Sequence, residues 1–220
     1  MSRIDWGSFS TDILSVVLGI FITFGIQGLI DRRHEKKEVM AALELVKEEL
    51  INNNINLCDA IGIISSEKSA AESISKNISS LQKCDADSVI AWNAILGNEY
   101  FFTITDDALE LLKSSSLFQK INDKSLALSI IKAYDYLEAD AKGFNTHEQY
   151  KVSLYLDANT SKVRKASLSS SGPAYLKTFY STPEADYFLR SVIEMSDGSF
   201  LGAGISDIEA TIADIDSRMK

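Results

Sequence analysis

The stretch Ile13-Leu-Ser-Val-Val-Leu-Gly-Ile-Phe-Ile-Thr-Phe-Gly-Ile-Gln-Gly-Leu-Ile30 decides the fold of this chain, because it runs for 18 residues without a charged side chain. As an α-helix it spans about 27 Å, which is close to the hydrocarbon thickness of a bilayer. Trp6 and Phe9 precede it, where interfacial aromatic residues are favoured. The sequence therefore predicts one transmembrane helix over 13–30, preceded by a short extracytoplasmic tail over 1–12.

Two alternatives to a transmembrane helix fit this stretch less well. A signal peptide has a shorter apolar run, a more basic start and a small-residue cleavage site, whereas only Arg3 precedes this run and no such site follows it. A buried core helix is rarely apolar all round over this length, here bounded by Asp12 and Asp31.

The charges that flank the predicted span indicate its orientation. Arg32, Arg33, Lys36 and Lys37 follow the span, whereas Arg3 and the α-amine precede it. The positive-inside rule then places the C-terminal part in the cytoplasm. The four basic side chains after the span are expected at the lipid headgroups.

One face of the predicted span carries small and polar residues. Ser15, Gly19, Thr23 and Gln27 recur every four residues and therefore share a helix face. Small residues at this spacing let two membrane helices approach closely, and Gln27 can form a hydrogen bond across the contact. This pattern predicts a homo-oligomer or a contact with another membrane protein. The alternative is that such residues are simply common in membrane helices and that Gln27 reaches toward the interface.

The pattern after the span predicts a long amphipathic stalk helix over 31–82, continuous with the span. Apolar residues recur there at three- and four-residue spacing, and the stretch has no proline and only one glycine, Gly62. The consecutive asparagines 52–54 are either an exposed patch or a polar layer that sets helix register. The apolar positions are Val39, Leu43, Val46, Leu50, Leu57, Ile61 and Ile64, with Asn53 or Asn54 at the missing step.

Residues 83–220 predict a helical soluble domain that packs on this stalk. Short helices are expected over 88–96 and 108–117, and one helix or two over 122–165. The run 100–104 is expected to be an extended, buried linker. Thr182-Pro183-Glu184 is a strong helix start, and isoleucines at 205, 208, 212 and 215 form the apolar stripe of a last helix. The predicted fold is therefore mostly α: a transmembrane helix that continues into a stalk helix packed with a helical bundle.

Composition and motifs argue against an enzyme. The net charge of −9 makes nucleic acid an improbable main partner, because phosphate binding needs a basic face. His34 and His147 have no second histidine or cysteine at ligand spacing, so we interpret both as surface residues and expect no metal site or cofactor. No glycine-rich phosphate loop or nucleophile elbow occurs. The acids of 106–110 and 135–140 are interpreted as exposed faces.

The two cysteines, Cys58 and Cys84, are too few for a disulfide framework. We interpret them as reduced thiols in a reducing compartment, which agrees with a cytoplasmic domain.

Three segments together carry a family resemblance. They are Val17-Leu-Gly-Ile20 followed by Asp31-Arg-Arg-His-Glu-Lys-Lys37, the segment 111–122 followed by Ser125-Leu126, and the apolar repeat 205–215. This combination resembles a bacterial family of single-span membrane proteins whose helical C-terminal domain has no known function. The chain departs from that family at the end of the span, which has Gly25, Gln27 and Gly28, and at Ser115 or Ser116, where the family has a Ser-Gly turn. The resemblance implies a helical protein tethered to the bacterial inner membrane and implies no activity.

The functional hypothesis from sequence is a non-enzymatic, membrane-anchored helical scaffold or adaptor. It would self-associate or bind a membrane-protein partner, with the lipid bilayer as its other partner. The alternative is a sensor or effector subunit of a bacterial stress or phage-defence system that acts on the membrane. An enzyme whose site matches no motif is the third hypothesis.

Overall fold

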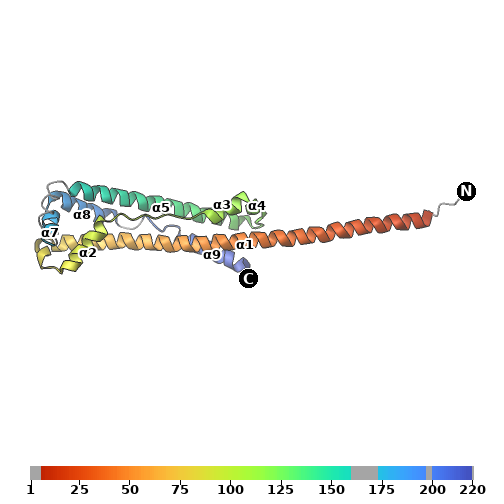
Figure 1. The fold of residues 1–220 in the computed structure, drawn as a ribbon, viewed down its shortest axis with the longest axis horizontal. Helices are drawn as coiled ribbons and strands as arrows, with labels where there is room; N and C mark the ends of the chain where they lie inside the picture. The colour runs from red at the N-terminus through yellow and green to blue at the C-terminus, as the bar shows by residue number, and fades with distance from the viewer. Residues whose placement is uncertain (1–5, 160–172, 197–199, 220) are drawn as a thin grey trace.

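A computed structural model describes the backbone over residues 6–159, 173–196 and 200–219, and side chains from Arg32 onward apart from positions 82, 173 and 174. Every regular element in these ranges is helical, and no strand occurs in them. The helices form one elongated bundle (Figure 1). The prediction of a mostly α chain with a helical bundle is therefore confirmed.

The longest element is α1, an unbroken helix of 72 residues from Trp6 to Asn77. At 1.5 Å per residue it is about 108 Å long. Its N-terminal half projects alone from the bundle, and its C-terminal half runs along the whole bundle (Figure 1). The absence of proline from this stretch removes the commonest cause of a helix kink.

Among the described side chains, we find no helix with a stretch long and apolar enough to cross a membrane. The predicted span over 13–30 lies outside those side chains, and so do Ser15, Gly19, Thr23 and Gln27.

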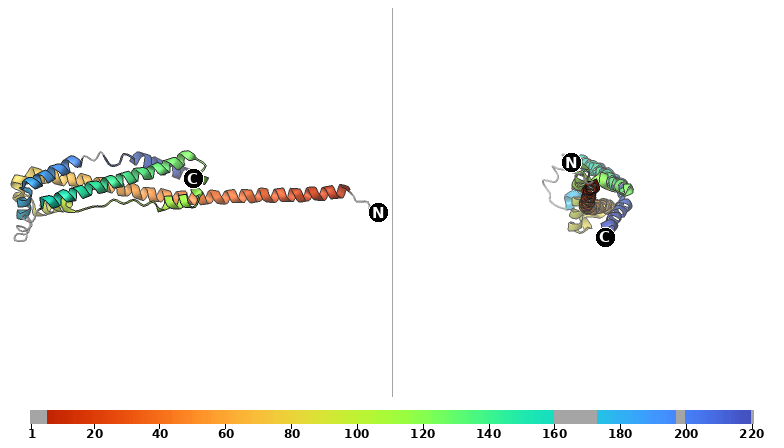
Figure 2. Two further views of the ribbon diagram at one scale, coloured as in Figure 1. Left: turned by 90° about the horizontal axis from the view of Figure 1, so that it is seen from above. Right: turned by 90° about the vertical axis from the view of Figure 1, so that its right-hand side faces the viewer.

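The other helices fold back on α1. After η1 (Ile78–Lys83) and α2 (Ala86–Gly97), an extended segment returns along the bundle to α3 (Asp107–Ser114) and α4 (Leu117–Lys120). Helix α5 (Lys124–Ala158) then runs parallel to α1, in the same direction along the bundle, and α7 (Pro173–Tyr180) lies across the far end (Figure 1). Helices α8 (Pro183–Met195) and α9 (Ile205–Met219) lead the chain back toward the projecting part of α1 (Figure 2). The sequence left open whether residues 122–165 form one helix or two, and the structure shows one helix as far as Ala158.

Local capping explains where several of these helices begin. The Asp123 carboxylate accepts hydrogen bonds from the backbone N–H groups of Ser125 and Leu126, and the Thr182 hydroxyl accepts one from Ala185 N–H. Pro183 occupies the first position of α8, where its missing N–H costs no hydrogen bond. The predicted helix start at Thr182 is thereby confirmed.

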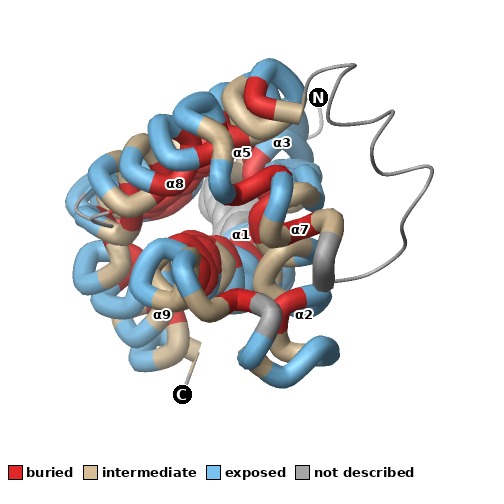
Figure 3. Tube along the Cα trace, turned by 90° about the vertical axis from the view of Figure 1, so that its left-hand side faces the viewer, coloured by how far each residue is buried: buried red, intermediate tan, exposed pale blue. Residues whose placement is uncertain are grey.

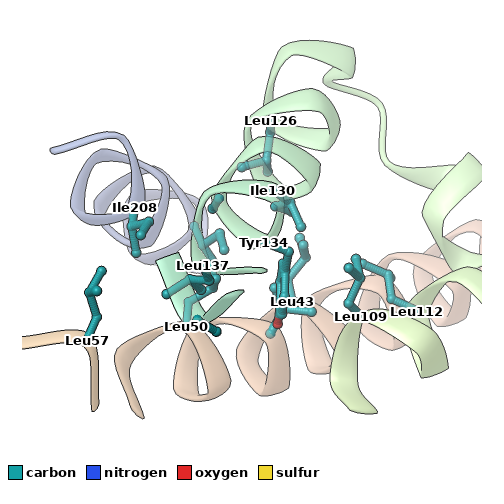
Figure 4. Packing of buried hydrophobic residues seen from close by; sticks show 14 of the residues in the cluster. Leu43, Leu50, Leu57, Leu109, Leu112, Leu126, Ile130, Tyr134, Leu137 and Ile208 are labelled. Carbon is teal, nitrogen blue, oxygen red and sulfur yellow. The ribbon is translucent and has the colours of Figure 1, made fainter. Parts of the chain in front are cut away.

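The core consists of two apolar clusters in series along α1. The first joins α1 to α3, α5 and α9, and the second joins the end of α1 to α2, α7 and α8. The buried faces of the helices point toward the centre of the bundle (Figure 3). Figure 4 shows Leu43, Leu50 and Leu57 of α1 facing side chains of α5 and α9. The predicted apolar stripe of α1 is buried at Val39, Leu43, Val46, Leu50, Leu57 and Ile64, and Ile61 is half-buried.

Candidate functional site: a buried ionic cluster

Four ionisable side chains meet between the two apolar clusters. Glu67 comes from α1, and His147, Glu148 and Lys151 come from α5. His147 is 7% exposed, and the other three are fully buried. His147 and Glu148 lie four and three residues before Lys151, so the helix brings all three to the side of α5 that faces α1.

Hydrogen bonds connect these four side chains into one network. The Lys151 ammonium donates to Glu67 Oε1 and, over 2.7 Å, to Glu148 Oε2. His147 Nε2 lies 3.1 Å from Glu67 Oε2. The backbone N–H of Tyr100, in the extended segment before α3, donates to Glu148 Oε2 at 2.9 Å. Glu148 Oε1 is buried and has no hydrogen-bond partner among the described residues.

Two aromatic rings cover the network. Lys151 Nζ lies 5.3 Å from the centroid of the Tyr100 ring, which is within cation–π range. The His147 imidazole stacks on Phe200 with 5.7 Å between ring centroids. Phe200 precedes α9, so the cluster ties together α1, α5 and two connecting segments.

The two carboxyl groups respond differently to burial. Burial alone raises the pKa of Glu67, but the hydrogen bond from His147 and the nearby Lys151 ammonium outweigh it and leave the pKa lowered. Burial raises the pKa of Glu148 to about 7, and the adjacent Glu67 carboxylate acts in the same direction against Lys151. Glu148 therefore exchanges its proton near neutral pH, whereas Glu67 stays ionised.

The chemistry of the cluster favours an internal ion pair over a metal site. One ligand atom each from Glu67, His147 and Glu148 lies within 4.8 Å of the others, and these are ligand types that divalent metals accept. The Lys151 ammonium, however, is bonded to both carboxylates and already supplies the positive charge that a metal would bring. Because the four side chains are almost wholly buried, the cluster also offers no open position to a substrate.

The structure corrects two interpretations made from sequence. His147 was interpreted as a surface residue, but it is buried against Phe200. The acids of 135–140 were interpreted as an exposed face, but Asp140 is 6% exposed and accepts the backbone N–H of Gly202. His147 contacts Glu67 of α1 and Asp140 contacts Gly202, so both lie on faces of α5 that other parts of the chain cover.

The sequence left the asparagines 52–54 as either an exposed patch or a polar layer in the core, and Asn53 is the one that forms a buried polar contact. It is fully buried on α1, where its side-chain amide donates to the backbone carbonyl of Thr105 at 2.7 Å and accepts the Thr105 backbone N–H at 3.0 Å. This pair of bonds fixes the extended segment 98–106 against α1. Phe102 of the same segment is buried, as predicted, whereas Phe101 is exposed.

The four basic residues that follow the predicted span are all exposed on α1, just before Val39, the first buried residue among the side chains of α1 that the structure describes. Arg32 and Lys36 line a pocket with Lys120 and Arg218, at the end of the bundle from which the N-terminal half of α1 projects. Arg33 and Lys37 do not line it.

A scan of protein-family models, a search of curated proteins and a search of solved structures each found no match to this chain. The resemblance to a bacterial single-span family therefore stays a prediction.

Proposed function

We propose that this protein is a non-enzymatic scaffold or adaptor, anchored in the bacterial inner membrane by residues 13–30, that holds a helical bundle in the cytoplasm. The observation that carries the proposal is the continuity of α1. One helix without a joint contains the uncharged stretch at one end and lines both cores of the bundle at the other.

The arrangement of the bundle supports a membrane anchor over a core helix. Among the side chains described from Arg32 onward, the apolar clusters begin at Val39, and the N-terminal half of α1 projects beyond the packed helices (Figure 1). An uncharged stretch of 18 residues that the bundle does not cover needs another apolar environment. The exposed basic residues at 32, 33, 36 and 37 support a cytoplasmic position for the bundle.

Alkaline extraction of bacterial membranes tests the anchor. We expect the full chain to remain in the membrane pellet and a chain that begins at Arg32 to appear in the supernatant. Recovery of the full chain in the supernatant would refute the anchor and the scaffold together.

Self-association through the span is tested by a matched pair of substitutions. Gly19 and Gly28 are nine residues apart, which is about two and a half helical turns, so they lie on opposite faces of an ideal helix. Gly19→Leu falls on the face shared with Ser15 and Thr23, and Gly28→Leu does not. In a reporter assay for association of membrane helices, we expect Gly19→Leu to abolish the signal and Gly28→Leu to keep it. An equal response of the two variants would contradict a specific contact.

A sensor or effector subunit is the second candidate function, and the ionic cluster favours it. Glu148 has a pKa of about 7 and lies in a network that contains Glu67 of α1, so a change of protonation acts on the helix that continues into the span. A sensor of this kind depolarises cells when it is triggered, whereas a passive scaffold does not. A membrane-potential dye during cytoplasmic acidification, with the full chain and its Gly19→Leu variant, distinguishes the two functions.

A further inference from the structure

A pocket of about 590 Å³ opens at the end of the bundle nearest to the predicted span. It lies between α1, the connection from α4 to α5, and the last turn of α9. Its lining consists of Arg32, Glu35, Lys36, Val39, Leu43, Lys120, Ile121, Asn122, Asp123, Leu126 and Arg218.

The charge of this pocket is opposite to that of the protein. Four basic and two acidic side chains line it, although the whole chain carries a net charge of −9. Glu35 pairs with Lys120 at 3.0 Å, and Asp123 pairs with Arg218 at 2.8 Å.

Two of the four basic side chains are not used in these pairs. Arg32 and Lys36 make no ion pair with a described residue, and they lie one helical turn apart on the same face of α1. The pocket therefore presents two adjacent positive charges that lack a counter-ion within the described chain, which is the arrangement that a phosphate group satisfies.

The floor of the pocket is apolar. Val39, Leu43, Ile121 and Leu126 form it, and each is less than a tenth exposed. A low-dielectric floor strengthens the attraction between the basic rim and an anion, compared with the same charges on an open surface. Arg32 and Lys36 thus form a more favourable anion site than Arg33 and Lys37, which are exposed and do not line the pocket.

The position of the pocket selects the source of the anion. Arg32 and Lys36 follow the end of the predicted span by two and six residues, or about 3 and 9 Å along the helix, which places Arg32 within the headgroup layer and Lys36 at its outer edge. We propose that this pocket binds the phosphate of an anionic phospholipid, with Arg32 and Lys36 as the contacting residues. The inference rests on the proposed membrane anchor, and it adds a specific lipid site to the general attraction of a basic flank.

Two double variants with the same loss of charge test this site. Arg32→Gln with Lys36→Gln removes both unpaired cations of the pocket, and Arg33→Gln with Lys37→Gln removes two cations outside it. The full chain is purified in an uncharged detergent, where no charged bilayer surface contributes, and titrated with phosphatidylglycerol or phosphatidylcholine while native mass spectrometry counts bound lipids. We expect the pocket variant to bind phosphatidylglycerol at least about tenfold more weakly, and the control variant to stay within about threefold of the unchanged protein.

The remaining arms separate the possible sources of phosphate. Phosphatidylcholine is expected to bind weakly to all three proteins, and inorganic phosphate or glycerol 3-phosphate is expected not to displace phosphatidylglycerol. Equal losses in the two double variants, or full displacement by inorganic phosphate, would overturn the lipid site. If the full chain stays in membranes on alkaline extraction but gives either of these results, only the lipid site is refuted. If the full chain is absent from membranes, the proposed function is refuted as well.

Discussion

At the scale of single residues, Lys151 is the centre of the buried cluster, because its ammonium bonds to both Glu67 and Glu148. Removing one partner of a buried ion pair leaves an uncompensated charge, which typically costs about 3–5 kcal/mol of unfolding free energy. We therefore expect Lys151→Met to be destabilised by that amount in urea unfolding of the full chain in mild detergent. Lys76→Met is the control, because Lys76 forms an exposed pair with Glu72. If the two variants unfold at the same urea concentration, the cluster does not stabilise the fold.

Glu148 is expected to make stability depend on pH. Its ordinary pKa of 4.5 is raised to about 7 in the folded chain. Between these values the folded state holds a proton that the unfolded state has lost, so this contribution is complete below pH 4.5 and is lost as the pH rises through 7. The lowered pKa of Glu67 has the opposite effect on stability: its contribution is present above the ordinary pKa of a glutamate and is lost only as the pH falls below that pKa.

The expected loss between pH 4.5 and pH 7 is on the order of 2 kcal/mol. Glu148→Gln removes the titrating group and is expected to flatten this slope, which unfolding titrations at a series of pH values measure. Glu138→Gln, an exposed position on the same helix, should keep the slope. A Glu148→Gln variant with the original slope would show that another group causes it.

At the scale of elements, the beginning of α9 approaches α5 at Gly204. A methyl group at Gly204 would overlap the ring and Cβ of Tyr136, so Gly204→Ala forces the helix or the ring to move. We expect a loss of about 1–3 kcal/mol, as for other overpacked sites.

Gly62 of α1 provides the matched control for Gly204. A methyl group there meets no atom within 4 Å. Because alanine is favoured over glycine in a helix by about 0.5–1 kcal/mol, Gly62→Ala should stabilise the chain. Thermal unfolding followed by circular dichroism compares the two variants, and the same sign of change in both would contradict the packing described for Gly204.

Helix periodicity explains which elements the sequence predicts and which site residues it misses. The burial of the apolar stripe of α1 can be predicted from sequence, because apolar residues at three- and four-residue spacing share one helix face, and that face packs into the core. The same register contains polar residues at core positions: Asn53 and Glu67 on α1, and Glu148 and Lys151 on α5. These follow Leu50, Ile64, Phe144 and Glu148 by three or four residues.

The position of these polar residues in phase with the apolar stripes is the sequence signal for part of the buried cluster. A charged residue in phase with a core stripe indicates a buried partner on another helix. The identity of the partner does not follow from the sequence, because Glu67 and Lys151 are 84 residues apart and their contact depends on how α5 is aligned along α1. The pocket is unpredictable for the same reason, since it needs Arg32, Lys120 and Arg218 from three separate helices or turns.

At the scale of the whole molecule, the two apolar clusters lie in series along one helix with the ionic cluster between them. The two ends of the bundle therefore differ in the residues that they expose and in the helices that close them. The end nearest the predicted span carries the basic pocket, and the far end is closed by α7 and η1. Asn53 bonds the extended segment before α3, and Glu67 bonds α5. We expect these buried polar contacts to fix how the segments are aligned along α1, as well as to stabilise the bundle.

The same division predicts that the bundle folds without the first 31 residues. Every described member of both apolar clusters lies at Val39 or later, and so do the four residues of the ionic cluster. A chain that begins at Arg32 should therefore be helical and unfold cooperatively without detergent, with a Tm close to that of the full chain in mild detergent. Glu67→Leu in that shorter chain should lower the Tm, because Lys151 then remains buried without its main partner. A shorter chain that is unfolded or aggregated would mean that the N-terminal half of α1 stabilises the bundle as well as anchoring it.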